Sequence, residues 1–201
     1  GRALEDLVSY CAERGIRFVS DEIYHGITYD RPAETVLKLS DDAVVINSFS
    51  KYFCMTGWRL GWMVLPNDLI RPIECLAQNM FVSPSALSQH AAIQAFNCRD
   101  ELEGNVARYA ENRRILLDAL PAAGFDRIAP ADGAFYLYAD VRQLTNDSID
   151  FCRRLLHETG VAITPGIDFD RERGNRYVRF CFAGSTQDVS DASTRIANWL
   201  K

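Results

Sequence analysis

The segment from Asp42 to Pro66 constrains the fold most, because an apolar run leads directly into a short polar stretch that contains a lysine. Residues 43–46 (AVVI) predict a fully buried strand, and such strands in α/β proteins are usually parallel to their neighbours. Ligands of these sheets bind at the carboxyl ends of the strands, where Ser48, Ser50 and Lys51 follow. The segment therefore predicts a small-molecule site at one edge of a sheet.

A second apolar run, residues 60–65, follows Lys51 after a short connection. A crossover between parallel strands needs roughly a dozen residues or more, which the connection does not provide. The second run is therefore predicted to pair antiparallel to the first. Arg59 lies immediately before it, next to the polar stretch.

The residues before this segment also alternate between helix and strand. Apolar positions with helical spacing predict a helix over residues 3–14, ended by Gly15, and residues 16–20 predict a strand. Asp21 comes at the carboxyl end of that strand, and Tyr24 follows in a polar turn. This order of elements indicates an α/β sheet that is at least partly parallel.

The rest of the chain predicts further helices and then a separate unit. One helix is expected from Leu69, broken or bent near Pro72, and another over residues 87–96, capped by Ser83 or Ser85. A long helix is expected over residues 101–120. Beyond it we expect strands at 127–128, 134–141, 161–164 and 177–182, and helices at 147–159 and 187–200. We therefore predict two domains, residues 1–115 and 116–201, the second a small α+β unit.

Composition excludes several classes of protein. The 201 residues are 48% hydrophobic and 24% charged, as in ordinary globular proteins, and no apolar run reaches the roughly 18 residues of a membrane helix. A net charge of −5 argues against nucleic acid or an anionic membrane as a partner. The six cysteines lack paired spacing, which predicts thiols in a reducing cytoplasm and no metal site.

The polar residues suit the chemistry of one cofactor. An enzyme that uses pyridoxal phosphate needs a lysine amine, an acid beside the ring nitrogen and donors for the phosphate. Lys51 and Asp21 are the candidates for the first two. The hydroxyls of Ser48 and Ser50 and the guanidinium of Arg59 are the candidate phosphate donors, and the Tyr24 hydroxyl suits the phenolic oxygen of the ring.

Five stretches strengthen this hypothesis through their order along the chain: VSDEIY, SFSKYFCMTGWRLGW, PADGAFYLYADV, VAITPGIDF and YVRFCFA. Together they resemble the class I/II (fold type I) aminotransferases over essentially the whole chain. The resemblance implies part of the mostly parallel sheet of that family's large domain, followed by its small carboxyl-terminal domain.

The resemblance also implies roles for individual residues. Lys51 is then the Schiff-base lysine, Asp21 the partner of the ring nitrogen and Tyr24 the partner of the phenolic oxygen. Ser48 and Arg59, with Ser50, are implied phosphate ligands. Arg179, in YVRFCFA, corresponds to the arginine that binds the substrate's α-carboxylate.

Each residue alone also has an ordinary structural explanation. Asp21 could cap a turn, Tyr24 could be a half-buried core tyrosine and Arg59 an ion-pair partner. Lys51 could be a solvated surface lysine, and Arg179 could lie on an edge strand.

Family members are about twice this length, so the resemblance implies a carboxyl-terminal part that is inactive alone and homodimeric when full length. The predicted function is a pyridoxal-phosphate-dependent aminotransferase acting on an amino acid and a 2-oxo acid. A lyase or synthase of the same fold, such as a carbon-sulfur lyase, and a non-catalytic fragment remain the alternatives.

Overall fold

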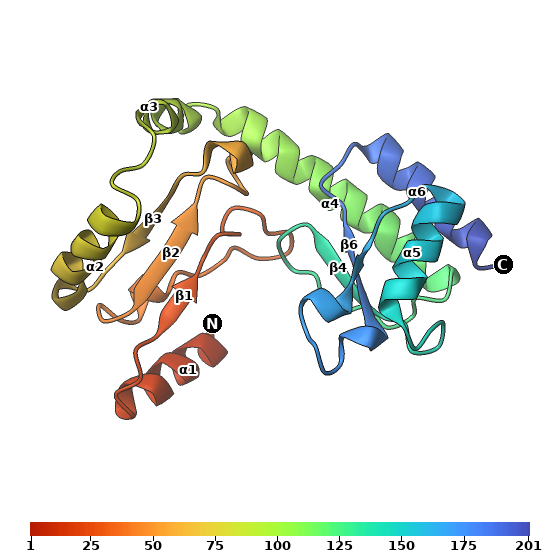
Figure 1. Ribbon diagram of the computed structural model, residues 1–201, viewed down its shortest axis with the longest axis horizontal. Coiled ribbons are helices and arrows are strands. Elements are labelled where there is room, and N and C mark those ends of the chain that lie inside the picture. Colours follow the sequence, from red (N-terminus) through yellow and green to blue (C-terminus); the bar gives the residue numbers. More distant parts are fainter. The chain divides into compact units, whose positions relative to one another are not determined.

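The computed structural model describes residues 1–201 and divides them into two compact units, Gly1–Glu103 and Gly104–Lys201. The division falls inside α4 (Arg99–Ala122), the long green helix in Figure 1. The domain boundary expected after residue 115 lies in the same helix and stays a prediction. Each unit is described by itself below.

The first unit is built on a three-stranded sheet in the order β1–β2–β3. Its strands are β1 (Val19–Asp21), β2 (Val44–Ser48) and β3 (Gly61–Val64). The pairing of β1 with β2 is parallel and that of β2 with β3 is antiparallel, so both predicted pairings are confirmed. The chain thus has the α/β character that the sequence predicts.

Three helices and two short 3-10 turns accompany this sheet: α1 (Arg2–Glu13), α2 (Asn67–Met80), α3 (Ala86–Ala95), η1 (Val36–Lys38) and η2 (Thr56–Trp58). Helix α1 packs on the sheet through Val8, which joins Val36 and Val45 in a buried apolar cluster. Ser85 caps α3 by accepting a hydrogen bond from the backbone N–H of Ser88 at 3.4 Å. This contact decides between the two predicted caps.

Two predictions for the first unit need correction. Ile46 was expected in a fully buried strand, but it is 39% exposed, whereas Val44 and Val45 before it are buried. Helix α2 was expected to break or bend near Pro72; it runs from Asn67 to Met80 without a break, and a bend stays a prediction. Pro72 lies in the second turn, where its missing N–H removes only one hydrogen bond, to the carbonyl of Asp68.

The second unit has its own antiparallel sheet in the order β4–β6–β5. Its elements are β4 (Tyr136–Asp140), α5 (Ser148–Thr159), β5 (Thr164–Pro165), η3 (Gly166–Asp168), η4 (Gly174–Arg176), β6 (Tyr177–Cys181) and α6 (Thr186–Trp199). Figure 1 shows α5 and α6 (cyan and blue) on the same side of this sheet. Their apolar faces and the sheet enclose the core of the unit.

Two expected strands of this unit are shorter than predicted. Residues 127–128 contribute only an isolated bridge from Ile128 to Ala139, and the strand expected over residues 161–164 begins at Thr164. Thr159 explains part of the second difference, because its hydroxyl accepts a hydrogen bond from the Val161 N–H at 3.1 Å and turns the chain there.

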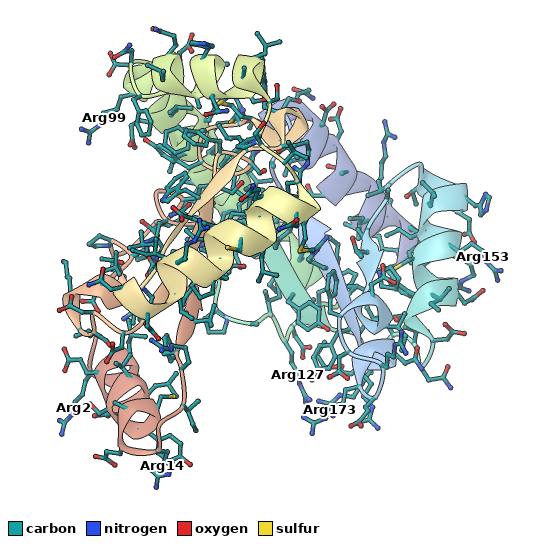
Figure 2. All side chains as sticks on the ribbon, turned by 60° about the vertical axis from the view of Figure 1, so that its left-hand side comes forward. Arg2, Arg14, Arg99, Arg127, Arg153 and Arg173 are labelled. Atoms are coloured by element: carbon teal, nitrogen blue, oxygen red, sulfur yellow. The ribbon has the colours of Figure 1, made fainter.

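Charged side chains project from the outer faces of the helices. Figure 2 shows Arg2 and Arg14 at the two ends of α1, and Arg153 on α5, pointing away from the ribbon. None of the helices combines the length and the apolar character needed to cross a bilayer.

Candidate active site

The candidate site of the first unit lies where the parallel strands β1 and β2 end. Asp21 is the last residue of β1 and is paired with Ile46 of β2, whose last residue is Ser48. The backbone N–H of Glu22 donates to the Ile46 carbonyl at 2.8 Å and extends the ladder by one residue. The segments that carry Asp21, Tyr24, Ser48 and Lys51 therefore leave the sheet at the same edge.

The turn after β1 holds Asp21 and Tyr24 in fixed positions. One carboxylate oxygen of Asp21 accepts a hydrogen bond from the Ile23 N–H at 3.2 Å, and its side chain is otherwise exposed. The Ile27 N–H donates to the Tyr24 carbonyl at 3.0 Å, and Ile27 is fully buried. The turn is thus anchored at both ends, and the Asp21 carboxylate stays accessible to a ligand.

Glu22 strengthens this anchoring from inside the protein. Its side chain is buried, with Oε1 accepting from the Val36 N–H at 2.9 Å and Oε2 lying 3.2 Å from Nδ1 of His25. The carboxylate therefore ties the Tyr24 turn to η1, fourteen residues along the chain. A buried carboxylate costs free energy unless it is paired in this way.

Two hydroxyls and a guanidinium gather at the end of β2. The Oγ atoms of Ser48 and Ser50 lie 2.9 Å apart, and the Ser50 N–H donates to Ser48 Oγ at 3.0 Å. Arg59 reaches the same place, with Nη1 3.5 Å from Ser50 Oγ. The structure therefore brings the three predicted phosphate ligands together, from positions up to eleven residues apart in the sequence.

The hairpin between β2 and β3 places Arg59 in this cluster. Ser48 Oγ and the Phe49 N–H both contact the Leu60 carbonyl at 3.1 Å, which closes the loop. Arg59 adopts a left-handed backbone conformation, with φ 52°, that an arginine adopts only when its surroundings hold it. At Gly61 a Cβ atom would lie 2.7 Å from the Asn47 carbonyl oxygen, so only glycine lets β3 approach β2 this closely.

Lys51 lies in the middle of this loop. The Cys54 N–H donates to the Lys51 carbonyl at 3.1 Å, and the loop is anchored by Phe49 and Met55, which are buried against Ala92 of α3. The amine nitrogen of Lys51 lies 5.6 Å from the ring centroid of Tyr24. Two residues that the sequence assigns to the same cofactor are therefore neighbours.

Tyr52, the residue after Lys51, has two contacts that the sequence did not suggest. Its hydroxyl donates to a carboxylate oxygen of Glu103 at 2.7 Å, and burial together with this contact raises the pKa of Tyr52 to about 12. Its ring lies against Gly26, where a Cβ atom would be 2.6 Å from Tyr52 Cδ2. Tyr52 therefore stays protonated at neutral pH and touches the turn that carries Tyr24.

Arg179 belongs to the second unit and has a distinct environment there. It lies on β6, the central strand of the sheet, so the explanation that it sits on an edge strand is wrong. Its guanidinium is 4.2 Å from the Tyr136 ring centroid and 4.4 Å from that of Phe169. Its Nη2 is 3.5 Å from Thr164 Oγ1, and its buried Nε has no hydrogen-bond partner.

Two aromatic rings beside a guanidinium support it by cation–π contact and leave its N–H edge to bind an anion. A buried donor without an acceptor is uncommon in proteins and calls for an explanation. A carboxylate of a ligand would supply the missing acceptor for Nε of Arg179. This chemistry fits the carboxylate site that the sequence predicts.

The donor set of the first unit also fits pyridoxal phosphate. Ser48, Ser50 and Arg59 present two hydroxyls and a cation within hydrogen-bonding reach of one another, which suits a phosphate. The amine of Lys51 and the ring of Tyr24 lie side by side, and Asp21 offers an accessible carboxylate at the same sheet edge.

Sequence reasoning missed several residues that shape these sites. In the first unit they are Glu22, Tyr52 and Thr56. The Thr56 hydroxyl donates to the Ser50 carbonyl at 2.5 Å. In the second unit they are Tyr136, Thr164 and Phe169, which surround Arg179. All six lie inside the quoted motifs, and only that position could have drawn attention to them.

Comparison with known proteins gives a consistent result. The family model described as "Aminotransferase class I and II" matches residues 2–196. A valine–pyruvate aminotransferase of Mycobacterium tuberculosis is 50% identical over 98% of this chain and 52% of its own length. The chain thus spans about half the length of this curated relative.

Solved structures agree with the sequence matches. A crystal structure of an aminotransferase from Mycobacterium tuberculosis superposes with a TM-score of 0.94 at 50% identity, covering 98% of this chain and 52% of that one. The aspartate aminotransferase of Thermotoga maritima gives a TM-score of 0.86 at 30% identity, covering 98% and 51%.

Proposed function

Because the chain belongs to the class I and II aminotransferase family, we propose that its full-length protein is a pyridoxal-phosphate-dependent aminotransferase that transfers an amino group from an amino acid to a 2-oxo acid. One observation carries this proposal: the hydroxyls of Ser48 and Ser50 and the guanidinium of Arg59 gather next to Lys51 in a chain that the family model matches over residues 2–196. The family as a whole implies the cofactor.

Five kinds of contact would hold the cofactor. The Ser48 and Ser50 hydroxyls and the Arg59 guanidinium would bind the phosphate, and the Lys51 amine would bond to the aldehyde carbon, whose oxygen leaves as water. Asp21 would keep the ring nitrogen protonated, and Tyr24 would donate to the phenolic oxygen. When bound, pyridoxal phosphate supplies an electron sink for the α carbon of the substrate.

The protein's residues would then have separate tasks in the reaction. Once the substrate's amine has replaced Lys51 on the aldehyde carbon, the freed Lys51 Nζ would take the proton from the substrate's α carbon as a general base. Arg179 binds the substrate's α-carboxylate through paired N–H groups, and the rings of Tyr136 and Phe169 fix the plane of its guanidinium. A lysine at position 179 could not form the same pair of hydrogen bonds.

The relatives suggest which substrates to try first. The 50% identical relative is named a valine–pyruvate aminotransferase, and a 30% identical relative from Sulfurisphaera tokodaii is named an aspartate aminotransferase. We therefore propose valine with pyruvate as the first pair, and aspartate as the second amino donor.

The test uses the full-length protein loaded with cofactor. Addition of valine alone should convert the bound cofactor to its amine form and release the corresponding 2-oxo acid in equal amount. Addition of pyruvate should then restore the starting spectrum and release alanine. A lyase of the same fold would instead release ammonia and a leaving group with no lasting amine form, and no spectral change with any amino acid would contradict both activities.

We also propose that the full-length protein is a homodimer in the cytoplasm. The six cysteines form no disulfide, which agrees with a reducing compartment. Large apolar side chains of the first unit that are exposed here, such as Met80, Phe81 and Leu87, could be covered in the assembled protein. Light scattering of the full-length protein tests this: a single monomeric species at micromolar concentration would contradict the dimer.

A further inference from the structure

Two loops of the first unit carry the candidate cofactor residues, and they touch each other at two adjacent points. The first is the approach of the Lys51 amine to the Tyr24 ring, at 5.6 Å. The second is the packing of the Tyr52 ring on Gly26, where a Cβ atom would lie 2.6 Å from Cδ2. Because Tyr52 follows Lys51 directly and Gly26 lies two residues after Tyr24, the two contacts are next to each other along both loops.

Gly26 makes this contact possible. Its φ of +93° is a conformation that residues with a side chain rarely adopt, and its lack of a Cβ atom leaves room for the Tyr52 ring. The neighbouring Tyr24 turn is itself held by Glu22 and by the buried Ile27. The ring of Tyr52 therefore rests on the same anchored turn that carries Tyr24.

A hydrogen bond fixes the other end of Tyr52. Its hydroxyl donates at 2.7 Å to Glu103 of α4, a residue of the same compact unit. Phe53 anchors the loop in a second direction, with its ring 4.8 Å from Phe49 and 5.2 Å from Phe96. Lys51 thus precedes two successive aromatic residues whose contacts run to different parts of the unit.

We propose that Tyr52 is a positioning residue that, through Gly26 and Glu103, holds the Lys51 amine at its working distance from Tyr24. This inference rests on the proposed function, because it assigns Tyr52 a role toward the same cofactor. Tyr52 acts through Lys51 and is not itself placed against the reacting atoms. A displacement of about 1 Å at a catalytic group can lower the rate on the order of 10²-fold.

The test uses the full-length protein with bound cofactor and four variants: Tyr52→Phe, Tyr52→Ala, Glu103→Gln and Glu103→Leu. Tyr52→Ala removes the ring and the hydrogen bond and should lower kcat on the order of 10²-fold, with the KM for the amino acid within about twofold. Tyr52→Phe removes only the hydrogen bond, and Glu103→Leu removes the hydrogen bond together with the carboxylate charge; each should lower kcat about threefold to tenfold. Glu103→Gln keeps an acceptor and should rescue most of that loss.

A second readout does not depend on turnover. The visible absorption of the bound cofactor changes with pH, and the midpoint of this change reports the surroundings of the Lys51 nitrogen. It should shift in Tyr52→Ala and Tyr52→Phe but not in Tyr10→Phe, a matched change at an exposed tyrosine of α1. Combining Tyr52→Phe with Glu103→Leu should be no worse than either change alone, because both remove the same contact.

The outcomes separate the two proposals. Borohydride reduction that fails to attach the cofactor to Lys51 in the parent protein overturns the function and this inference together. Attachment at Lys51 in the parent, with unchanged kcat and an unchanged spectral midpoint in both Tyr52 variants, overturns the inference alone. If Tyr52→Ala does not fold, the cycle of Tyr52→Phe and Glu103→Leu decides: additive losses contradict the proposal, and non-additive losses support it.

Discussion

The two units of the chain differ in how completely they cover their own sheets. In the second unit the inward side chains of β4 and β6 are almost inaccessible, as Leu137, Ala139 and Val178 at 0% exposure show. In the first unit all four residues of β3 are exposed, and α2 has no buried residue. The first unit nevertheless carries six of the seven predicted site residues.

Most of the exposed large apolar side chains of the first unit fall within residues 62–96: Trp62, Met63, Val64, Ile70, Leu76, Met80, Phe81, Val82, Leu87, Ile93 and Phe96. We expect other protein to cover them, because large exposed apolar surfaces are typical of interaction sites. The chain spans about half the length of its curated relatives, which agrees with this view. The difference teaches that the loops with the proposed cofactor residues lie on the unit with the exposed apolar side chains, while Arg179, the proposed carboxylate ligand, lies on the unit that buries its own core.

The largest expected effect concerns cofactor affinity. The 201-residue chain expressed alone should bind pyridoxal phosphate several orders of magnitude more weakly than the full-length protein. The relatives are about twice as long. We expect the additional residues to supply two or three more hydrogen bonds to the phosphate, and losing these at roughly 1 to 3 kcal/mol each would have this effect. Titration followed by the visible absorption band measures it. If the 201-residue chain gave one equivalent of the absorption band at micromolar cofactor, the first unit would bind the cofactor without further protein. That result would contradict the comparison.

Two leucine-to-alanine substitutions, one in each unit, compare how much a side chain contributes to the free energy of unfolding. Leu155→Ala, at a fully buried position of α5, should destabilise the second unit by about 2 to 5 kcal/mol. Leu76→Ala, at a position of α2 that is 55% exposed, should cost the 201-residue chain less than about 0.5 kcal/mol. Urea unfolding followed by circular dichroism tests both. Equal costs would show that α2 is packed as tightly as α5.

Asp21→Ala should impair catalysis without harming the fold. The side chain is exposed and makes one local hydrogen bond, so stability should change little. Loss of the carboxylate beside the ring nitrogen should lower kcat on the order of 10²-fold in the full-length protein. Asp21→Asn should be almost as impaired, because it keeps the size but not the charge. Near-normal turnover of either variant would refute the role of Asp21.

The smallest effect is a dependence of stability on alkaline pH in the first unit. The pKa of Tyr52 is raised to about 12 from the ordinary 10.0, so the folded state holds this proton more tightly than the unfolded state. The contribution of the protonated Tyr52 hydroxyl to the free energy of unfolding is complete below pH 10 and is lost as pH rises from 10 toward 12. Urea midpoints of the parent should therefore fall more steeply over that range than those of Tyr52→Phe, with Tyr10→Phe as the control. Parallel curves for parent and Tyr52→Phe would contradict this.

The sequence predicts well those features that depend on neighbouring residues. The antiparallel direction of β3 follows from the short connection after Lys51. The sequence offered two serines as the N-cap of α3, and Ser85 is the one that caps it. The cluster of Ser48, Ser50 and Arg59 could be predicted because one hairpin carries all three.

Features that depend on distant residues could not be predicted. The contact between Tyr52 and Glu103 joins positions 51 residues apart, and that between Glu22 and Val36 joins positions 14 apart. The burial of Ile46 was predicted wrongly, because apolar character alone does not say whether another element covers a face. The rings beside Arg179 come from β4 and from the loop after η3, and no local pattern links them.

The most direct test of the account is the site of covalent attachment in the full-length protein. Borohydride reduction of the cofactor-loaded protein, followed by peptide mapping, should place the label on the peptide that contains Lys51, and Lys51→Arg should remove it. Label on the peptide of Lys38 or Lys201, or on a lysine outside these 201 residues, would contradict the assignment of Lys51 and with it the proposed active site.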